Sequence, residues 1–392
     1  MAFLVGFIFA VRIVIVLLAV RVLGTDARTG TGMVIGLNFL LLGLVCFHSL
    51  GNAERTFGSM IRLPSVRWVL AFLAFSSCSF FWSETVSPSA STAYWCSMAA
   101  DVAIVAILLR AAPAASVGGS MMKGFVLGAC CLALIAWAMP AQSDLRLGDE
   151  DYFNANQIGN LCAIAIFLAQ YLMRRKDGNW GPAFLFLAVT LLRTLSKTTI
   201  VAFVASQGFL ILRDRSMSRK TKMLHVFAAG LTILSFWGLL ESYYVVYTHA
   251  GNQAETLTGR IGIWAYVLNV AVERPWIGHG FDSMWKVIPA FGDFEARHAE
   301  NEVLQQFYAY GVAGICILAG LYASVYLQFR RLSHGPLKII LLSLLLFVIV
   351  RGLAEAEPFD LLLPLWAIVL FSLLAEQLRL SNQDDSIALQ RA

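Results

Sequence analysis

The sequence predicts an all-α polytopic membrane protein with about twelve membrane-spanning helices, on two observations. First, hydrophobic residues make up 59% of the chain and charged residues only 14%, with a mean hydropathy of +0.72. Second, apolar runs of about twenty residues, which cross roughly 30 Å of hydrocarbon, recur from Ala2 to Leu378 with short polar links between them. This composition excludes a soluble globular chain.

The spans are expected to be helices, because a segment isolated in lipid must satisfy its own backbone hydrogen bonds and a barrel strand would alternate in hydrophobicity. Hydropathy places them near residues 2–23, 32–50, 66–82, 91–110, 121–139, 155–174, 180–194, 198–213, 224–242, 303–329, 337–355 and 361–378. The first span is expected to be retained, because no small-residue cleavage site follows a short apolar core.

This segmentation predicts four regions. Nine spans lie in 1–242, a long loop with short helices in 243–302, three spans in 303–378 and a polar, disordered tail in 379–392.

Lys and Arg collect in alternate links, for example 174–176 and 213–222, which indicates the cytoplasmic side. The opposite links, such as 83–85 and 144–151, are acidic or mixed and are therefore expected outside. Both termini then face the cytoplasm.

The formal charge of +5 is spread over these small clusters, so it does not indicate nucleic acid as a partner. All seven cysteines fall in predicted spans, so no disulfide and no zinc site are expected.

The long outer loop, from about Glu241 to Glu302, is the obvious candidate for a functional element. Within it, Thr258 is predicted to cap an amphipathic helix that lies on the membrane surface. The apolar residues at helical spacing are Ile261, Trp264, Val267, Leu268 and Ala271.

Charged groups at the rim of a membrane domain cost a few kcal/mol each on insertion scales, so they need a partner or a function. Arg193 and Lys197 lie where the seventh span meets the eighth, on the predicted outer side, against the positive-inside pattern. Snorkelling to headgroups and anion binding both explain them. Arg260 adds its charge to the start of the loop helix, which favours phosphate or carboxylate, unless it is an ordinary surface arginine.

Arg351 is followed one helical turn later by Glu355, and an intrahelical ion pair is favoured over an arginine aimed into a cavity. His298 directly precedes the tenth span. A histidine there exchanges a proton near neutral pH and a neighbouring carboxylate sets its tautomer, although a simple capping role stays open. No nucleotide-binding motif accompanies it and its loop holds no Asp-x-Asp pair, so no metal-dependent nucleotide donor is expected.

Taken in order, the motifs of the second half resemble the core of O-antigen ligases and exopolysaccharide polymerases. They are Leu257-Thr258-Gly259-Arg260 with Ile263-Trp264, Glu273-Arg274-Pro275-Trp276-Ile277-Gly278-His279-Gly280, His298-Ala299-Glu300-Asn301 with Leu304-Gln305, and Gly311 with Gly314. Upstream, Asn156 and Gly159 resemble the family's Asn-x-x-Gly element, and Ser196-Lys197-Thr198 resembles its Ser-rich junction.

The resemblance implies a helical glycosyltransferase of the GT-C type at the outer face of the bacterial inner membrane. Such an enzyme moves a glycan from undecaprenyl diphosphate to a saccharide or lipid A-core acceptor, without cofactor or metal. The matching positions make His298 the base and Arg260 and Arg193 ligands of the diphosphate. Further candidates for the diphosphate cluster are Lys197 and Arg351, and for supporting roles Asn301, Glu355 and Asn156.

One position departs from the family's pattern, because Glu300 stands where many relatives carry a second histidine. The base is therefore either His298 or Glu300. Ligase and polymerase both stay open, although the stretch from Thr258 to Trp285 looks closer to the polymerases. A flippase of lipid-linked oligosaccharides and a non-catalytic assembly partner are the alternatives from other classes, and other polysaccharide assembly proteins are possible partners.

Overall fold

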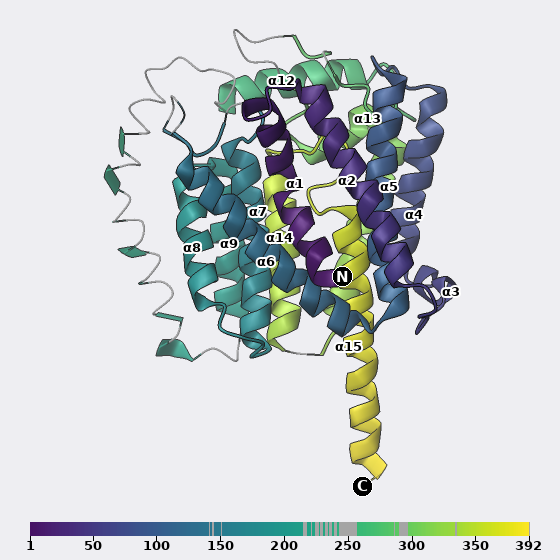
Figure 1. The fold of residues 1–392 in the computed structure, drawn as a ribbon, viewed down its shortest axis with the longest axis vertical. Coiled ribbons are helices and arrows are strands. Elements are labelled where there is room, and N and C mark those ends of the chain that lie inside the picture. Colours follow the sequence, from purple (N-terminus) through teal and green to yellow (C-terminus); the bar gives the residue numbers. More distant parts are fainter. Residues whose placement is uncertain are drawn as a thin grey trace. The chain divides into compact units, whose positions relative to one another are not determined.

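The computed structural model describes residues 1–140, 142, 145–149, 151–214, individual positions between 218 and 242, 257–285, 287–289, 297–333 and 335–391. Regular structure in these residues is helical, apart from an isolated bridge between Asp149 and Phe153. The helices (Figure 1) are α1 (Ala2–Arg21), α2 (Ala27–His48), α3 (Phe57–Ile61), α4 (Pro64–Cys78), η1 (Ser79–Phe81), α5 (Pro88–Ala111), α6 (Ala114–Ala138), α7 (Ala155–Arg174), α8 (Gly181–Arg193), α9 (Lys197–Arg213), α12 (Leu257–Ala271), α13 (Glu302–Arg330), α14 (Pro336–Gly352) and α15 (Leu365–Arg391).

The predicted fold class, an all-α polytopic membrane protein, is confirmed. Among the described residues, seven helices are long and apolar enough to cross a membrane, namely α1, α2, α4 with η1, α5, α6, α7 and α13. The shorter α8, α9 and α14 have 13, 17 and 17 residues. The predicted span 224–242 falls mainly outside the described residues, so the count of twelve stays a prediction.

The C-terminal region differs from its prediction. Instead of a disordered tail at 379–392, α15 continues as one helix to Arg391. No glycine or proline between 379 and 391 ends the helix, so the hydrogen-bonded turns run on past the apolar part.

The chain divides into two compact units. Unit 1 comprises Met1–Val34, Gly119–Asn252 and His334–Phe347, and unit 2 comprises Ile35–Gly118, Gln253–Ser333 and Val348–Ala392.

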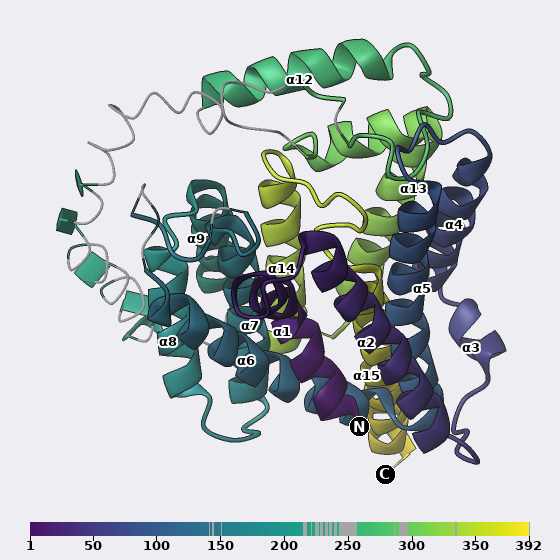
Figure 2. The same cartoon turned by 45° about the horizontal axis from the view of Figure 1, so that its top comes forward.

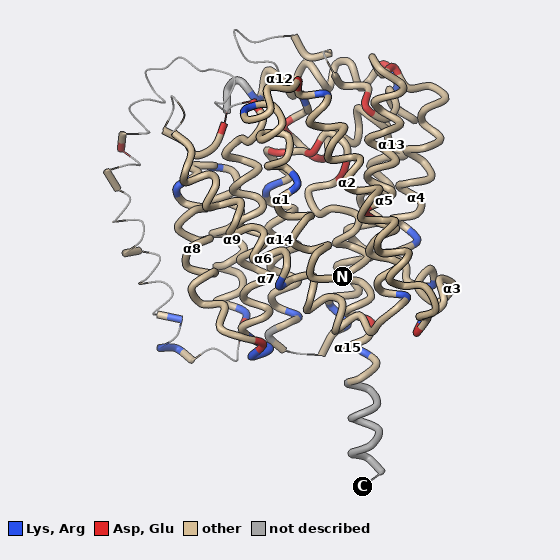
Figure 3. Tube along the Cα trace, in the orientation of Figure 1, with Lys and Arg blue, Asp and Glu red and all other residues tan. Residues whose placement is uncertain are grey.

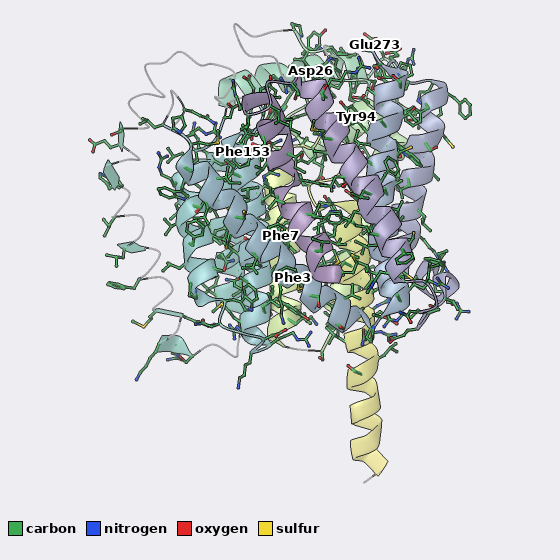
Figure 4. All side chains as sticks on the ribbon, viewed as in Figure 1. Phe3, Phe7, Asp26, Tyr94, Phe153 and Glu273 are labelled. Carbon is green, nitrogen blue, oxygen red and sulfur yellow. The ribbon has the colours of Figure 1, made fainter. Side chains whose placement is uncertain are left out.

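In unit 1, close approach of α1 to α6 depends on glycine. A Cβ added at Gly124 would overlap the carbonyl oxygen of Phe3, and one at Gly128 would meet the carbonyl oxygen of Phe7 at 2.7 Å. Phe3 and Phe7 are labelled in Figure 4. Small residues of this kind let membrane helices pack backbone to backbone. α7 packs against both α8 and α9, and the side chain of Asn154 caps its first turn by accepting from Gln157 N.

In unit 2, α13 packs against α4, α12 and α15, and α12 runs across the direction of α4 and α5 (Figures 1 and 2). α12 begins at Leu257, so Thr258 lies inside its first turn and not at the predicted cap position, a shift of the size expected at helix ends. Its buried face is made by Ile263, Val267 and Ala271, which pack with Ala299 and Tyr308.

The apolar residues predicted for this helix divide between two faces. Ile261 and Leu268, which the sequence placed with Val267 and Ala271, are 54% and 47% exposed. The buried stripe follows the i, i+4, i+8 row that faces α13, and Ile261 and Leu268 lie off that row.

α13 is broken at Gly311, whose φ of 62° and ψ of −153° are not helical. The segment 275–280 fits against this break, because Val312 N donates to Pro275 O at 2.8 Å and Gly280 N donates to Ala309 O at 2.8 Å. Gly278, with φ +65°, lies so close that a Cβ would overlap the backbone of Ala309. The glycine-rich motif therefore belongs to the packing of α13, and it positions the start of that helix.

Candidate functional site

The turn that carries His298 leads directly into α13 and is held in place by Asn301. Glu300 adopts φ +50°, and Asn301 then caps α13 by accepting from Leu304 N at 2.9 Å. The amide of Asn301 also donates to Leu353 O at 2.9 Å. Asn301 thus ties the turn to the segment that follows α14.

Arg260 joins three segments of unit 2. Its Nη1 donates to Ala354 O at 2.5 Å, and its Nη2 lies 3.0 Å from Glu355 Oε1 and 3.3 Å from Glu300 Oε2. Only 14% of its side chain is exposed. The structure therefore brings together three of the residues that the sequence singled out, Arg260, Glu300 and Glu355.

Arg351 completes this group from the end of α14. It is the largest fully buried side chain, and its Nη2 lies 3.7 Å from Glu355 Oε2. The predicted pair forms, but it is not intrahelical, because α14 ends at Gly352 and Glu355 lies in the segment after it. The helix ends where a Cβ at position 352 would come within 3.0 Å of Glu302 Oε2. One carboxylate, that of Glu355, thus serves two guanidinium groups.

His298 lies beside the carboxylate of Glu300, with 23% of the histidine side chain exposed. Its Nδ1 is 3.5 Å from Glu300 Oε1 and accepts a long bond of 3.4 Å from the backbone N–H of Glu300. The backbone carbonyl of Glu300 accepts from Trp264 Nε1 at 3.2 Å, which holds the turn against α12. Within the described residues, the hydrogen bonds of His298 involve Nδ1, and Nε2 is left for another partner.

Glu302 was not predicted as a site residue, and it ties the first turn of α13 to the segment before α15. It is buried, accepts from the hydroxyl of Tyr322 at 2.8 Å and accepts from Leu362 N at 2.8 Å. A carboxylate in the first turn of an apolar helix was the sequence signal that could have revealed it. Figure 3 shows that acidic residues of unit 2 gather at the end where α12 lies.

The other predicted residues belong to unit 1. Arg193 Nη1 donates to Leu145 O at 2.5 Å, and Lys197 is the exposed first residue of α9. Asn156 Oδ1 accepts from Arg146 Nη2 at 2.5 Å and from Ser196 Oγ at 2.8 Å. Two arginines and a lysine therefore lie near the α8–α9 junction, with Asn156 holding one of the arginines.

Arg146 was missed by the sequence argument, although it is a buried arginine in the acidic link at 144–151. Its basic charge in the 144–151 segment, against the acidic pattern of that segment, was the available signal.

The sequence argument also missed the contact between a second histidine of unit 2, His279, and a carboxylate. Its Nδ1 lies 2.8 Å from Glu84 Oε2 and its Nε2 lies 3.1 Å from Val270 O. The ring stacks on Tyr308 with centroids 4.6 Å apart, and Arg274 Nη2 is 2.5 Å from the other oxygen of Glu84. No sequence spacing joins position 84 to position 279, so only the fold could reveal this pair.

The segment after His279 is held to the start of α5. The hydroxyl of Ser91 donates to Asp282 Oδ2 at 2.6 Å. Burial raises the pKa of Asp282 above its ordinary value, and the Ser91 bond opposes that shift. Asp282 thus anchors the loop and is not a member of the His298 group, the name used below for His298, Glu300, Arg260, Glu355 and Arg351.

Known proteins similar to this chain bear on the whole arrangement. A family model described as O-Antigen ligase matches residues 182–319, which include Arg193, Arg260 and His298. The chain is 26% identical over 169 residues to an O-antigen ligase of Pseudomonas aeruginosa, which covers 43% of this chain and 39% of that protein. It is 23% identical over 329 residues to Exopolysaccharide production protein ExoQ of Rhizobium meliloti, which covers 75% of this chain and 73% of that protein.

The match to the O-antigen ligase spans well under half of that relative's length, whereas the match to ExoQ reaches into both units of the fold. The family model covers nearly all of α8, all of α9 and α12 and most of α13, whereas Asn156, Arg351 and Glu355 lie outside the matched residues. Together with the multi-pass helical fold, these similarities support the predicted resemblance to the O-antigen ligase and polymerase superfamily.

Proposed function

We propose that the protein transfers a glycan from undecaprenyl diphosphate to the hydroxyl of a saccharide acceptor, at the periplasmic face of the bacterial inner membrane. The observation that carries the proposal is the His298 group, in which a partly exposed histidine lies beside Glu300, whose carboxylate also contacts the guanidinium of Arg260. A base next to an anion-binding group is what this displacement needs.

In the proposed reaction, the acceptor hydroxyl oxygen attacks the anomeric carbon of the donor glycan and the bond from that carbon to the phosphate oxygen breaks. His298 Nε2 takes the hydroxyl proton, and undecaprenyl diphosphate leaves with the bonding electrons. The new glycosidic bond therefore forms without a nucleotide, a cofactor or a metal, since guanidinium groups take up the charge that develops on the diphosphate.

Arg260 and Arg193 are the proposed diphosphate ligands, because a planar guanidinium matches two phosphate oxygens at once. Lys197 and Arg351 are proposed to add positive charge. Glu355 and Asn301 support the site by holding Arg260 and the 353–355 segment in place, as their bonds at 3.0 and 2.9 Å indicate. Asn156 is proposed to do the same for the Arg193 region through Arg146.

The proposed topology places nine spans before a periplasmic loop at 243–302 and three after it, with both termini in the cytoplasm. In this arrangement α12 lies on the outer membrane–water boundary. Exposed Ile261 and Leu268 are suited to contact lipid there.

Within this function we favour a polysaccharide polymerase over a lipid A-core ligase. The relative named for exopolysaccharide production aligns over 75% of the chain, against 43% for the O-antigen ligase. Offering purified protein a lipid-linked oligosaccharide as acceptor, or lipid A-core instead, separates the two, because a polymerase extends the former into a ladder on a gel.

The decisive experiment supplies purified protein in lipid nanodiscs with a defined undecaprenyl-diphosphate glycan and measures both donor binding and product formation. Arg260→Ala is expected to weaken donor binding by roughly tenfold or more, the loss typical of one charged hydrogen-bonded contact. Arg67→Ala is the matched control, because Arg67 donates to Ile61 O at 2.9 Å in unit 2 and lies outside the His298 group.

Equal donor binding in the Arg260 and Arg67 variants would contradict the site. Movement of the donor across vesicle membranes with no new glycosidic bond would instead support a flippase. Polymer output that survives every substitution in the His298 group would point to a non-catalytic assembly partner.

A further inference from the structure

The carboxylate of Glu300 is divided between two partners that the proposed reaction uses separately. Its Oε2 lies 3.3 Å from Arg260 Nη2, and its Oε1 lies 3.5 Å from His298 Nδ1. Glu300 is buried, with 8% of the residue exposed, and its backbone is held in the left-handed region by the turn before Asn301. A side chain at this position reaches both the anion-binding group and the base.

The tautomer of His298 in this arrangement is not the one that a base requires. Nδ1 accepts the backbone N–H of Glu300, so the neutral ring carries its proton on Nε2. Nε2 then has no lone pair with which to take a proton from an acceptor hydroxyl. A carboxylate that moved onto Nδ1 would favour the Nδ1–H tautomer and give Nε2 its lone pair.

The contacts of Arg260 suit an exchange of the Glu300 carboxylate for another anion. Its guanidinium stays fixed by Ala354 O at 2.5 Å and by Glu355 Oε1 at 3.0 Å, both on the segment after α14. The contact with Glu300, at 3.3 Å, is the longest of the three. Losing it would leave the guanidinium oriented, so an incoming diphosphate meets a preorganised arginine.

We propose that Glu300 is a positioning residue that couples donor binding to the base: the donor's diphosphate takes its place on Arg260, and the released carboxylate then bonds Nδ1–H of His298. This inference rests on the proposed function. Protonation of the His298 ring by the acceptor hydroxyl would follow only in the donor-bound state, which protects the site from wasteful proton transfer before the donor is in place. Arg260 and His298 face the Glu300 carboxylate, and Glu355 contacts both Arg260 and Arg351.

Glu300→Gln separates this coupling from a purely structural role. The variant loses the negative charge and keeps the shape. Donor affinity is expected to rise about threefold, because Arg260 no longer has Glu300 as a competitor. The transfer rate at saturating donor and acceptor is expected to fall by 10- to 100-fold, since the base loses the group that sets its tautomer. The loss is expected in kcat while the apparent KM for the donor falls, a split that a mere loss of folded protein would not produce.

Glu355→Gln is the comparison variant. It removes a carboxylate from Arg260 at a similar distance but does not contact His298, so its fall in transfer rate should be much smaller than that of Glu300→Gln. Glu300→Asp, which keeps the charge on a shorter side chain, should restore part of the rate. Where Glu300→Gln folds poorly, the rate and the donor affinity of the Asp variant carry the test.

The outcomes are distinguishable. A natural protein that forms no glycosidic bond from the lipid-linked donor refutes the proposed function itself. An active natural protein whose Glu300→Gln variant keeps its rate and its donor affinity refutes the coupling alone. Weaker donor binding in Glu300→Gln also overturns it, and so does a His298→Ala variant that stays active while Glu300→Gln is inactive, because Glu300 would then be the base.

Discussion

Two histidines of unit 2 meet carboxylates in opposite ways. His279 contacts Glu84 at 2.8 Å and Val270 O at 3.1 Å, and its side chain is 4% exposed. His298 approaches Glu300 only at 3.5 Å and its side chain is 23% exposed. A ring held through both nitrogens has no atom left to take a proton from a substrate, whereas a ring held through one nitrogen keeps the other for chemistry.

The difference follows from what each histidine joins. His279 lies in the segment packed into the break of α13 at Gly311, and its backbone N–H also donates to Tyr308 O at 3.0 Å. His298 lies in the turn before α13, beside Arg260 on α12. A structural histidine therefore differs from a candidate base in the number of its ring nitrogens that have partners, and not in the presence of a neighbouring glutamate.

The largest expected effect comes from His298→Asn. Transfer should fall by at least about 100-fold, because general base catalysis contributes about 10²- to 10⁴-fold. Donor binding and the thermal midpoint should change little, since the ring makes one long hydrogen bond. Initial rates in nanodiscs and thermal unfolding followed by intrinsic fluorescence measure both. A variant that loses stability but keeps its rate would show that His298 is a structural residue and not the base.

His279→Asn is expected to do the opposite. It removes the ring from the bond with Glu84 and from its stack on Tyr308, leaving a buried carbonyl without its donor, at a cost of about 2 kcal/mol. The thermal midpoint should drop, and the rate per folded molecule should stay within a few-fold of the natural protein. A rate loss as large as that of His298→Asn would show that His279 has a chemical role.

Gly278→Ala tests the packing that both histidines share. The new Cβ would overlap the backbone of Ala309 and Tyr310, and φ of +65° is itself unfavourable for alanine, so about 1–3 kcal/mol should be lost. Gly43→Ala in α2 is the control, because a Cβ there meets nothing within 4 Å and alanine favours a helix. Equal thermal midpoints for the two variants would mean that the 275–280 segment does not need its close approach to α13.

The smallest expected effect concerns pH. Burial raises the pKa of Asp282 in the folded protein, so the folded state binds this proton more tightly than the unfolded chain does. Its contribution to stability is therefore present at acidic pH and is lost as pH rises above the ordinary range of an aspartate. Asp282→Asn should remove this decline from a plot of thermal midpoint against pH, and an unchanged slope would speak against it.

Much of the site region could be predicted because its signals are local. Asn301 caps α13 as a residue before an apolar run should, and Arg260 falls in the first turn of a helix that the spacing around Trp264 predicted. The break at Gly311 could not be predicted, since a single glycine in a long apolar run is equally compatible with an unbroken span. The Arg351–Glu355 spacing suggested one helix, but α14 ends at Gly352, between the two residues.

The sequence by itself determined the membrane fold, because every span must carry enough apolar length to satisfy the lipid and that requirement is written residue by residue. Tertiary structure alone decided which charges meet. Glu84 and His279, Arg146 and Asn156, and the Arg260–Glu300–Glu355 group are brought together by helix packing. The physical reason is that an ion pair depends on distance in space, and spacing along a chain sets that distance only within a turn or two of helix.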